Sequence, residues 1–259
     1  MRKEQFAAFQ DWFNSYVGAF YQETPGFQSW IELKDNHTRR VGDIIIRIGR
    51  SLDLPEEDLL LAGTIALFHD VGRFKQVHLY GTFNDRRSEN HATLGIRVLA
   101  ESAVLDGISQ EEADIIIKAI ELHNLRELPG GLPKRLHLFA RLIQDADKLD
   151  ILELFTCHYG GESGGYGAAL DSHLPDTPGY SADLVEDILQ EKLGNYKDVK
   201  NRNDRKLLHL SWIYGIHFRF TLSELERNGY VEKIIAVLPG DEVTRKVYQL
   251  VKSHIAGNH

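Results

Sequence analysis

The residues with the most evident chemistry are histidines on helical stripes. The sequence contains 12 histidines but only one cysteine in 259 residues. Helical spacing places four of these histidines in line with apolar side chains, as His37 is with Val41 and Ile44. Side chains three or four residues apart share one face of a helix, so each imidazole should point toward a common core. These four are His37, His69, His91 and His123.

Two aspartates belong to the same pattern. Asp70 directly follows His69, and Asp147 lies on an inward stripe with Ala140 and Ile143. One buried histidine alone is typical of an ordinary core. Four of them with two carboxylates favour a metal site, because buried polar groups need partners.

The ligand types indicate which metals such a site would hold. Imidazole and carboxylate without thiolate suit Mn, Fe, Co, Ni or Zn better than Ca. Six ligands exceed what one tetrahedral zinc needs. We therefore predict divalent transition-metal ions. The adjacent His69 and Asp70 would either reach one ion together or let Asp70 bridge two ions. Two ions that share a carboxylate would generate hydroxide near neutral pH and clamp a phosphate.

The elements that must position these residues are helices. Helical periodicity runs through nearly the whole chain, which predicts an all-α fold. We expect helices at about 35–50 and 134–156, a capping box at Ser109 and Glu112, and a helix cap at Ser88 before His91. One all-α domain over 1–259 is expected, with a metal-binding core at 30–160 and a C-terminal extension at 180–259 packed on that core.

Composition excludes several classes of function. The formal net charge of −8 argues against binding to nucleic-acid polymers or anionic membranes. A single cysteine excludes an intrachain disulfide framework. No apolar run has the length of a membrane span, and the first residues do not form a signal peptide, so we expect a cytoplasmic protein.

The order of the six residues resembles that of the HD superfamily of metal-dependent phosphohydrolases. The resemblance implies an HD-type helical bundle with additional C-terminal helices. It is carried by the segments NHTRRV (36–41), LFHDVGRF (67–74), ENHATLGIRVL (89–99), AIELHN (119–124) and DADKLD (145–150).

The resemblance also implies roles for individual residues. His37, His69, Asp70 and Asp147 match the metal ligands of the family. The pair His91 and His123 matches the ligands of the two-metal branch, in which Asp70 would bridge the ions and position the hydroxide. Within DADKLD, the family pattern selects Asp147, and Asp145 and Asp150 stay open as other partners. Lys148 follows the ligand aspartate, where related enzymes use lysine on phosphate.

Departures from the family patterns bear on the substrate. Phosphodiesterases of the HD-GYP type carry HDIGK, a tandem His-His and a GYP triplet. Here the counterparts are HDVGR, His123-Asn124 and Gly131-Leu132-Pro133, which argues against cyclic dinucleotides. Arg73 replaces the lysine and is expected to hold a phosphate oxygen. Arg86 and Arg87 belong either to a phosphate-binding segment or to a solvated loop.

The predicted function is hydrolysis of a phosphomonoester or phosphodiester, with nucleotides among the candidates, by metal-activated hydroxide. The expected partner is a small anionic phosphate substrate, and a homodimer is a family-level expectation. Two alternatives stay open: a di-iron oxygenase with the same ligands, and a regulatory nucleotide-binding module. Ser163 in GESGG matches the G-x-S-x-G pattern, but it follows a helix instead of the strand that a serine hydrolase requires.

Overall fold

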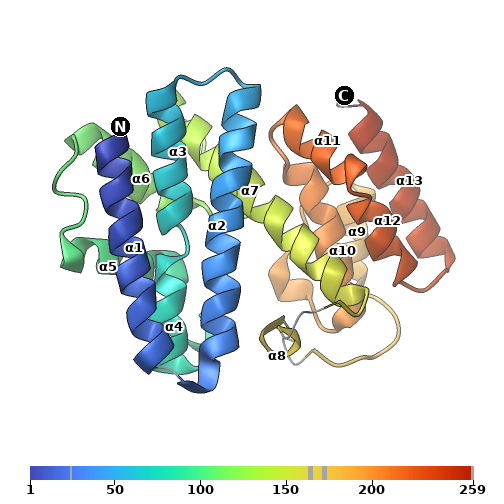
Figure 1. Cartoon of the computed structure of the whole chain (residues 1–259). Helices are drawn as coiled ribbons and strands as arrows, with labels where there is room; N and C mark the ends of the chain where they lie inside the picture. Colours follow the sequence, from blue (N-terminus) through green and yellow to red (C-terminus); the bar gives the residue numbers. More distant parts are fainter. Residues whose placement is uncertain (24, 163–165, 171–173, 258–259) are drawn as a thin grey trace. The chain divides into compact units, whose positions relative to one another are not determined.

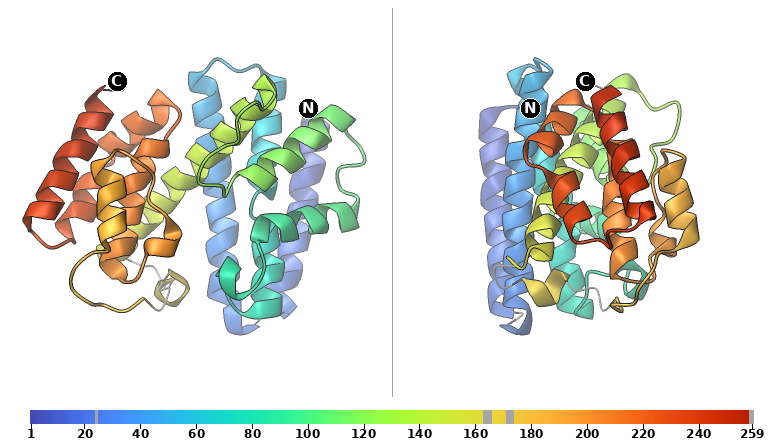
Figure 2. Two further views of the ribbon diagram at one scale, coloured as in Figure 1. Left: turned by 180° about the vertical axis from the view of Figure 1, so that it is seen from behind. Right: turned by 90° about the vertical axis from the view of Figure 1, so that its right-hand side faces the viewer.

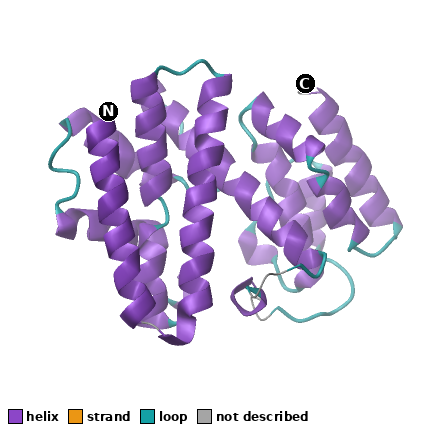
Figure 3. Cartoon of the chain, viewed as in Figure 1, coloured by secondary structure: helices purple, strands orange, loops and turns teal. Residues whose placement is uncertain are grey.

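All regular structure in the described part of the chain is helical (Figure 3). The computed structural model describes residues 1–23, 25–162, 166–170 and 174–257. The all-α prediction is confirmed, and Ser163 lies outside the described residues. In those ranges no helix is both long and apolar enough to span a bilayer.

The helices form two compact units, an N-terminal unit of Met1–Asp147 and a C-terminal unit of Lys148–His259. The division falls inside one long helix, α7 (Lys134–Tyr159). A single continuous body over the whole chain, with the extension packed on the core, stays a prediction.

The N-terminal unit is built on helices that pack side by side (Figure 1). α3 packs against α1, α2 and α6, and α4 packs against α2 and α5. The left view of Figure 2 brings α5 and α6 to the front of this unit. Its largest fully buried side chains include Phe13, Phe68, Phe74 and Phe139. The helices are α1 (Lys3–Glu23), α2 (Gln28–Ser51), α3 (Glu56–Phe68), α4 (Val71–Tyr80), α5 (His91–Ser102) and α6 (Gln110–Leu122), with short 3-10 helices at Pro25–Phe27 and Asp85–Arg87.

Of the two helix caps predicted from the sequence, Ser109 and Ser88, the structure shows one. Ser109 Oγ accepts a hydrogen bond from the Glu112 N–H at 3.3 Å, which confirms the predicted cap of α6. The prediction of Ser88 as the cap of α5 is wrong. Asn90 caps this helix by accepting from the Thr93 N–H at 3.1 Å, because the helix begins directly after it at His91.

A close approach of α4 to α5 depends on glycine. A Cβ atom at Gly72 would lie 2.2 Å from the His91 carbonyl oxygen and 2.5 Å from the Gly95 nitrogen. No side chain fits there, because real carbon atoms do not approach backbone atoms so closely. Gly72 therefore allows the turn after Asp70 to lie against the start of α5.

The C-terminal unit is also helical throughout its described residues. α10 packs against α9 and α12, and α13 packs against α9 and α12. Its core includes Leu184, Ile188, Leu207 and Val251. Besides the end of α7, its helices are α8 (Gly167–Leu170), α9 (Ala182–Leu189), α10 (Arg202–Ser211), α11 (Arg219–Arg227), α12 (Tyr230–Ala236) and α13 (Glu242–Gly257), with 3-10 helices at Tyr196–Asp198 and Trp212–Gly215.

Candidate metal centre

The six predicted ligands all belong to the N-terminal unit and come from different helices or helix ends. The four imidazoles and Asp70 are at most 5% exposed. His69 and His123 are the first residues after their helices, where the backbone turns. The positions are His37 in α2, His69 after α3, Asp70 before α4, His91 at the start of α5, His123 after α6 and Asp147 in α7.

Asp70 is common to two groups that could each hold a metal ion. One group is His37, His69 and Asp70, the other is Asp70, His91 and His123, and the ligand atoms of each lie within 4.8 Å of one another. Asp70 Oδ2 lies 3.5 Å from His37 Nε2 and 3.7 Å from His69 Nε2. Its other oxygen, Oδ1, lies 3.4 Å from His91 Nε2. The two oxygens of one carboxylate thus face different histidines.

Asp147 joins the first of these groups. Its Oδ1 lies 3.1 Å from His37 Nε2 and 3.8 Å from His69 Nε2. Asp145 and Asp150 on the same helix are fully buried, whereas the side chain of Asp147 is 17% exposed. The described contacts that link a carboxylate of this helix to the histidines are those of Asp147.

Hydrogen bonds fix the tautomer of three of the imidazoles. The Nδ1 atoms of His69 and His123 lie 2.7 Å from the carbonyl oxygens of Ala66 and Ile120. The Nδ1 atom of His91 lies 2.7 Å from Asp85 Oδ2. Carbonyl and carboxylate oxygens only accept, so each Nδ1 carries the proton and each neutral ring presents a lone pair at Nε2.

The arrangement of His91 and His123 fits a cation. Burial, with Arg73 adding to it, lowers the pKa of His91 to about 4. Burial, with His69 adding to it, also lowers the pKa of His123 to about 4. Both rings are neutral at pH 7, and their Nε2 atoms lie 3.0 Å apart with no proton between them. Two lone pairs repel at that distance, and a metal ion bound by both removes the repulsion.

The carboxylates are held in the charged form that metal binding requires. Burial raises the pKa of Asp70, but Lys34, His69, Arg73 and His91 together lower it well below its usual value. Burial likewise opposes ionisation of Asp147, but the hydrogen bond from His37 and the electrostatic influence of His37 and His69 lower its pKa far below the ordinary range. Imidazole and carboxylate donors, with no thiolate, suit divalent transition metals.

Comparison with protein families agrees with this geometry. Residues 35–152 match the family model described as HD domain. This part of the chain is an HD domain. The matched residues include all six predicted ligands, and the resemblance inferred from the sequence is confirmed. Searches of curated proteins and of solved structures gave no match.

HD domains bind divalent metals, and this one contains two buried His/Asp groups that could hold them. The HD superfamily is of the metal-dependent hydrolase type.

Two residues that contact this centre, Lys34 and Asp85, were not predicted from the sequence. Lys34 Nζ donates to Asp70 Oδ2 at 2.6 Å. The sequence contained a signal for Lys34, because this residue lies one helical turn before His37 and so shares its helix face. Asp85 accepts the His91 Nδ1–H bond, and burial opposes its ionisation, but that bond and Arg73 lower its pKa to about 2. Asp85 lies in a segment without periodicity, where the sequence gives no signal.

Of the predicted phosphate-binding residues, Arg73 is the one that the described contacts bring to the centre. Its Nε lies 3.5 Å from Asp70 Oδ1, and its Nη1 donates to Asp85 Oδ1 at 2.8 Å. Arg86 and Arg87 are exposed on the 3-10 helix Asp85–Arg87. Lys148 belongs to the C-terminal unit and donates to the Gly215 carbonyl at 2.8 Å.

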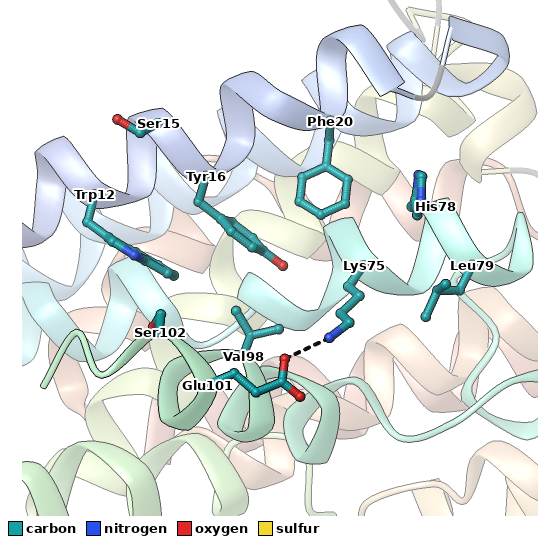
Figure 4. A pocket seen from close by; sticks show the side chains of 10 residues that line it. All are labelled: Trp12, Ser15, Tyr16, Phe20, Lys75, His78, Leu79, Val98, Glu101 and Ser102. Atoms are coloured by element: carbon teal, nitrogen blue, oxygen red, sulfur yellow. Dashed lines mark hydrogen bonds and ion pairs between the residues drawn. The ribbon is translucent and has the colours of Figure 1, made fainter.

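A groove of about 660 Å³ on the HD-containing unit is separate from these residues (Figure 4). Trp12, Tyr16 and Phe20 of α1 line it together with side chains of α4 and α5. The ion pair of Lys75 with Glu101, 3.0 Å apart, lies along it. None of the predicted ligands lines this groove.

Proposed function

We propose that the HD domain is a metal-dependent phosphohydrolase whose centre holds two divalent ions that share Asp70. One observation carries the proposal. The two oxygens of Asp70 face different histidine pairs, and the unprotonated Nε2 atoms of His91 and His123 point at each other across 3.0 Å. A single ion would leave one of these donor groups unused.

Each residue has a distinct task in this proposal. Two divalent ions, when bound, supply a nucleophilic hydroxide near neutral pH and stabilise the charge that develops at phosphorus. The Nδ1 hydrogen bonds of His69, His91 and His123 keep their Nε2 atoms unprotonated and aimed inward. Asp70 places negative charge between the two histidine pairs.

Two cations beside Asp70 favour a phosphate substrate. Lys34 and Arg73 lie on opposite oxygens of the Asp70 carboxylate, with side chains that are each 15% exposed. Their positive charge attracts an oxyanion to a centre in an otherwise acidic chain. We propose Arg73 as a phosphate contact, and Arg86, Arg87 and Lys148 stay proposed contacts as well.

The substrate proposed is a small phosphomonoester or phosphodiester, with nucleotides among the candidates. The test starts from protein purified without added metal and analysed for its elements. Phosphate release is then screened over monoesters and diesters with Mn²⁺, Fe²⁺, Co²⁺ and Ni²⁺.

The outcomes of this screen separate the classes of function. We expect metal-dependent release of phosphate from at least one ester, and loss of that release after chelation. Retained metal with no release from any ester would contradict the hydrolase proposal. Oxygen uptake that depends on iron, without phosphate release, would replace it by an oxygenase.

A further inference from the structure

The Nδ1 partner of His91 differs in kind from those of two other histidines of the centre. His69 and His123 donate from Nδ1 to backbone carbonyls of the helices they follow. His91 donates to a charged side chain, with Nδ1 2.7 Å from Asp85 Oδ2. A carboxylate partner raises the basicity of a metal-binding imidazole more than a neutral carbonyl does.

The Asp85 carboxylate is itself held in place from α4. Its Oδ1 accepts from Arg73 Nη1 and from Gln76 Nε2, each at 2.8 Å. Gln76 is fully buried and also donates to Ser88 Oγ and to the Glu89 carbonyl, each at 2.9 Å. Asp85 thus links the helix that follows Asp70 to the first residue of α5, and it fixes the ring direction of His91.

We infer that Asp85 is a positioning residue that sets the metal affinity of the Asp70–His91–His123 group and leaves the His37–His69–Asp70 group unaffected. The inference rests on the two-ion centre proposed above. Removing a carboxylate partner from a metal-binding histidine typically weakens metal binding by about 10- to 100-fold.

The contacts of Asp85 explain why the effect is confined to one group. Its described partners are His91, Arg73 and Gln76, so among the six predicted ligands it touches His91. On the other side of the centre, Lys34 holds Asp70 Oδ2, the oxygen that faces His37 and His69. Asp85 therefore supports a histidine that only one of the two groups contains, whereas Lys34 supports the oxygen of Asp70 that faces the other group.

The test is the variant Asp85→Asn, which keeps the shape of the side chain and removes its charge. The full chain is stripped with a chelator and titrated with Mn²⁺, and free Mn²⁺ is followed by electron paramagnetic resonance. The unmodified protein is expected to bind two ions. In Asp85→Asn one site should keep its affinity and the other should weaken by about 10- to 100-fold.

A matched control comes from the same segment. Glu89 is a carboxylate four residues further on, and it accepts from the Tyr80 hydroxyl and pairs with Arg97. Glu89→Gln should leave both Mn²⁺ affinities unchanged. Thermal unfolding of each variant, measured with the chelator present, reports whether the segment still folds.

Two double variants separate a positioning role of Asp85 from a general loss of structure, because each combines Asp85→Asn with the loss of one ligand. In His123→Ala, which removes a ligand of the same group, Asp85→Asn should have little additional effect. In His37→Ala, which removes a ligand of the other group, the weakening by Asp85→Asn should persist.

The inference fails if Asp85→Asn weakens both ions equally, weakens neither, or acts as strongly in His123→Ala as in the unmodified protein. A single bound ion in the unmodified protein would instead refute the two-ion proposal, and this inference would fall with it.

Discussion

Both units of the molecule contain buried histidines, but the side chains that surround these histidines differ. In the HD domain, His37, His69, His91 and His123 meet at Asp70. In the C-terminal unit, His209 is 3% exposed, and burial, with Arg205 adding to it, lowers its pKa to about 3. Its ring centre lies 4.5 Å from that of Phe155 and 4.7 Å from that of Trp212.

The difference lies in what the ring nitrogens face. His209 Nδ1 lies 3.1 Å from the Tyr159 hydroxyl, an ordinary partner for a core histidine. In the HD domain the Nε2 atoms of two rings face each other and a shared carboxylate. Among the described residues, groups suited to hold a metal occur in the N-terminal unit. Burial and a lowered pKa alone therefore do not mark a metal ligand.

The largest effect is expected from Asp70→Asn. This change removes the charge that both groups share, so both ions should be lost. Metal catalysis contributes several kcal/mol, so phosphate release should fall at least about a thousandfold. Elemental analysis and initial rates measure the two effects. His209→Leu is the matched control, and an equal loss of metal in it would erase the contrast between the units.

The second effect is expected from Gly72→Ala, which tests whether the histidine cluster depends on helix approach. The added Cβ would meet the backbone of α5 at 2.2 Å. We expect a loss of about 3 kcal/mol in the free energy of unfolding, and weaker metal binding because His91 is displaced. Urea denaturation and Mn²⁺ titration measure these effects.

Gly18→Ala is the control for Gly72→Ala. Gly18 lies inside α1, and nothing lies within 4 Å of the position that a Cβ atom would take there. Alanine at this position should stabilise the protein by about 0.5–1 kcal/mol. A similar response at both glycines would show that the approach of α4 to α5 does not matter.

The fold class and the histidine cluster could be predicted from the sequence because both depend on local periodicity. Helical spacing placed four imidazoles and two aspartates on inward faces, and the structure brings them together around Asp70. The choice of Asp147 came from the family pattern, because burial would have favoured Asp145 and Asp150, which are less exposed than Asp147. The roles of the four histidines and of Asp70 and Asp147 as metal ligands stay predictions.

What could not be predicted depends on tertiary contacts. Asp85 meets His91 only because Arg73 and Gln76 of α4 fix its carboxylate. Ser88 and Asn90 both have side chains that can cap a helix. Which of them caps α5 depends on the residue at which the helix begins. Nothing in the sequence sets His209 apart, because its aromatic neighbours come from separate parts of the chain.

A smaller effect is expected from His209→Leu, which tests that this histidine belongs to the core alone. The change removes one hydrogen-bond partner of the Tyr159 hydroxyl, which keeps Arg205, and should cost about 1–2 kcal/mol of stability. Metal content should not change. Urea denaturation and elemental analysis of the same samples measure both quantities.

The last prediction concerns the pH dependence of stability in metal-free protein. An unfolded histidine takes up a proton below about pH 6.5, whereas folded His91 and His123 do so near pH 4 and His209 near pH 3. The unfolded state binds more protons in this window, so stability should fall as the pH is lowered from about 6.5 to 4.

Each such histidine contributes a slope of up to about 1.4 kcal/mol per pH unit. His209→Leu should remove the contribution of one histidine to the slope and leave the contributions of His91 and His123 unchanged. Urea denaturation at a series of pH values measures the slope, and an unchanged slope would mean that burial does not lower the pKa of His209.

The central claim is that Asp70 lies between two metal ions. Crystals grown with Mn²⁺ and measured at a wavelength with strong manganese anomalous scattering test it most directly. The account predicts two anomalous peaks, one beside His37 and His69 and one beside His91 and His123, with Asp70 bound to both. A single peak, or two peaks of which only one contacts Asp70, would contradict it.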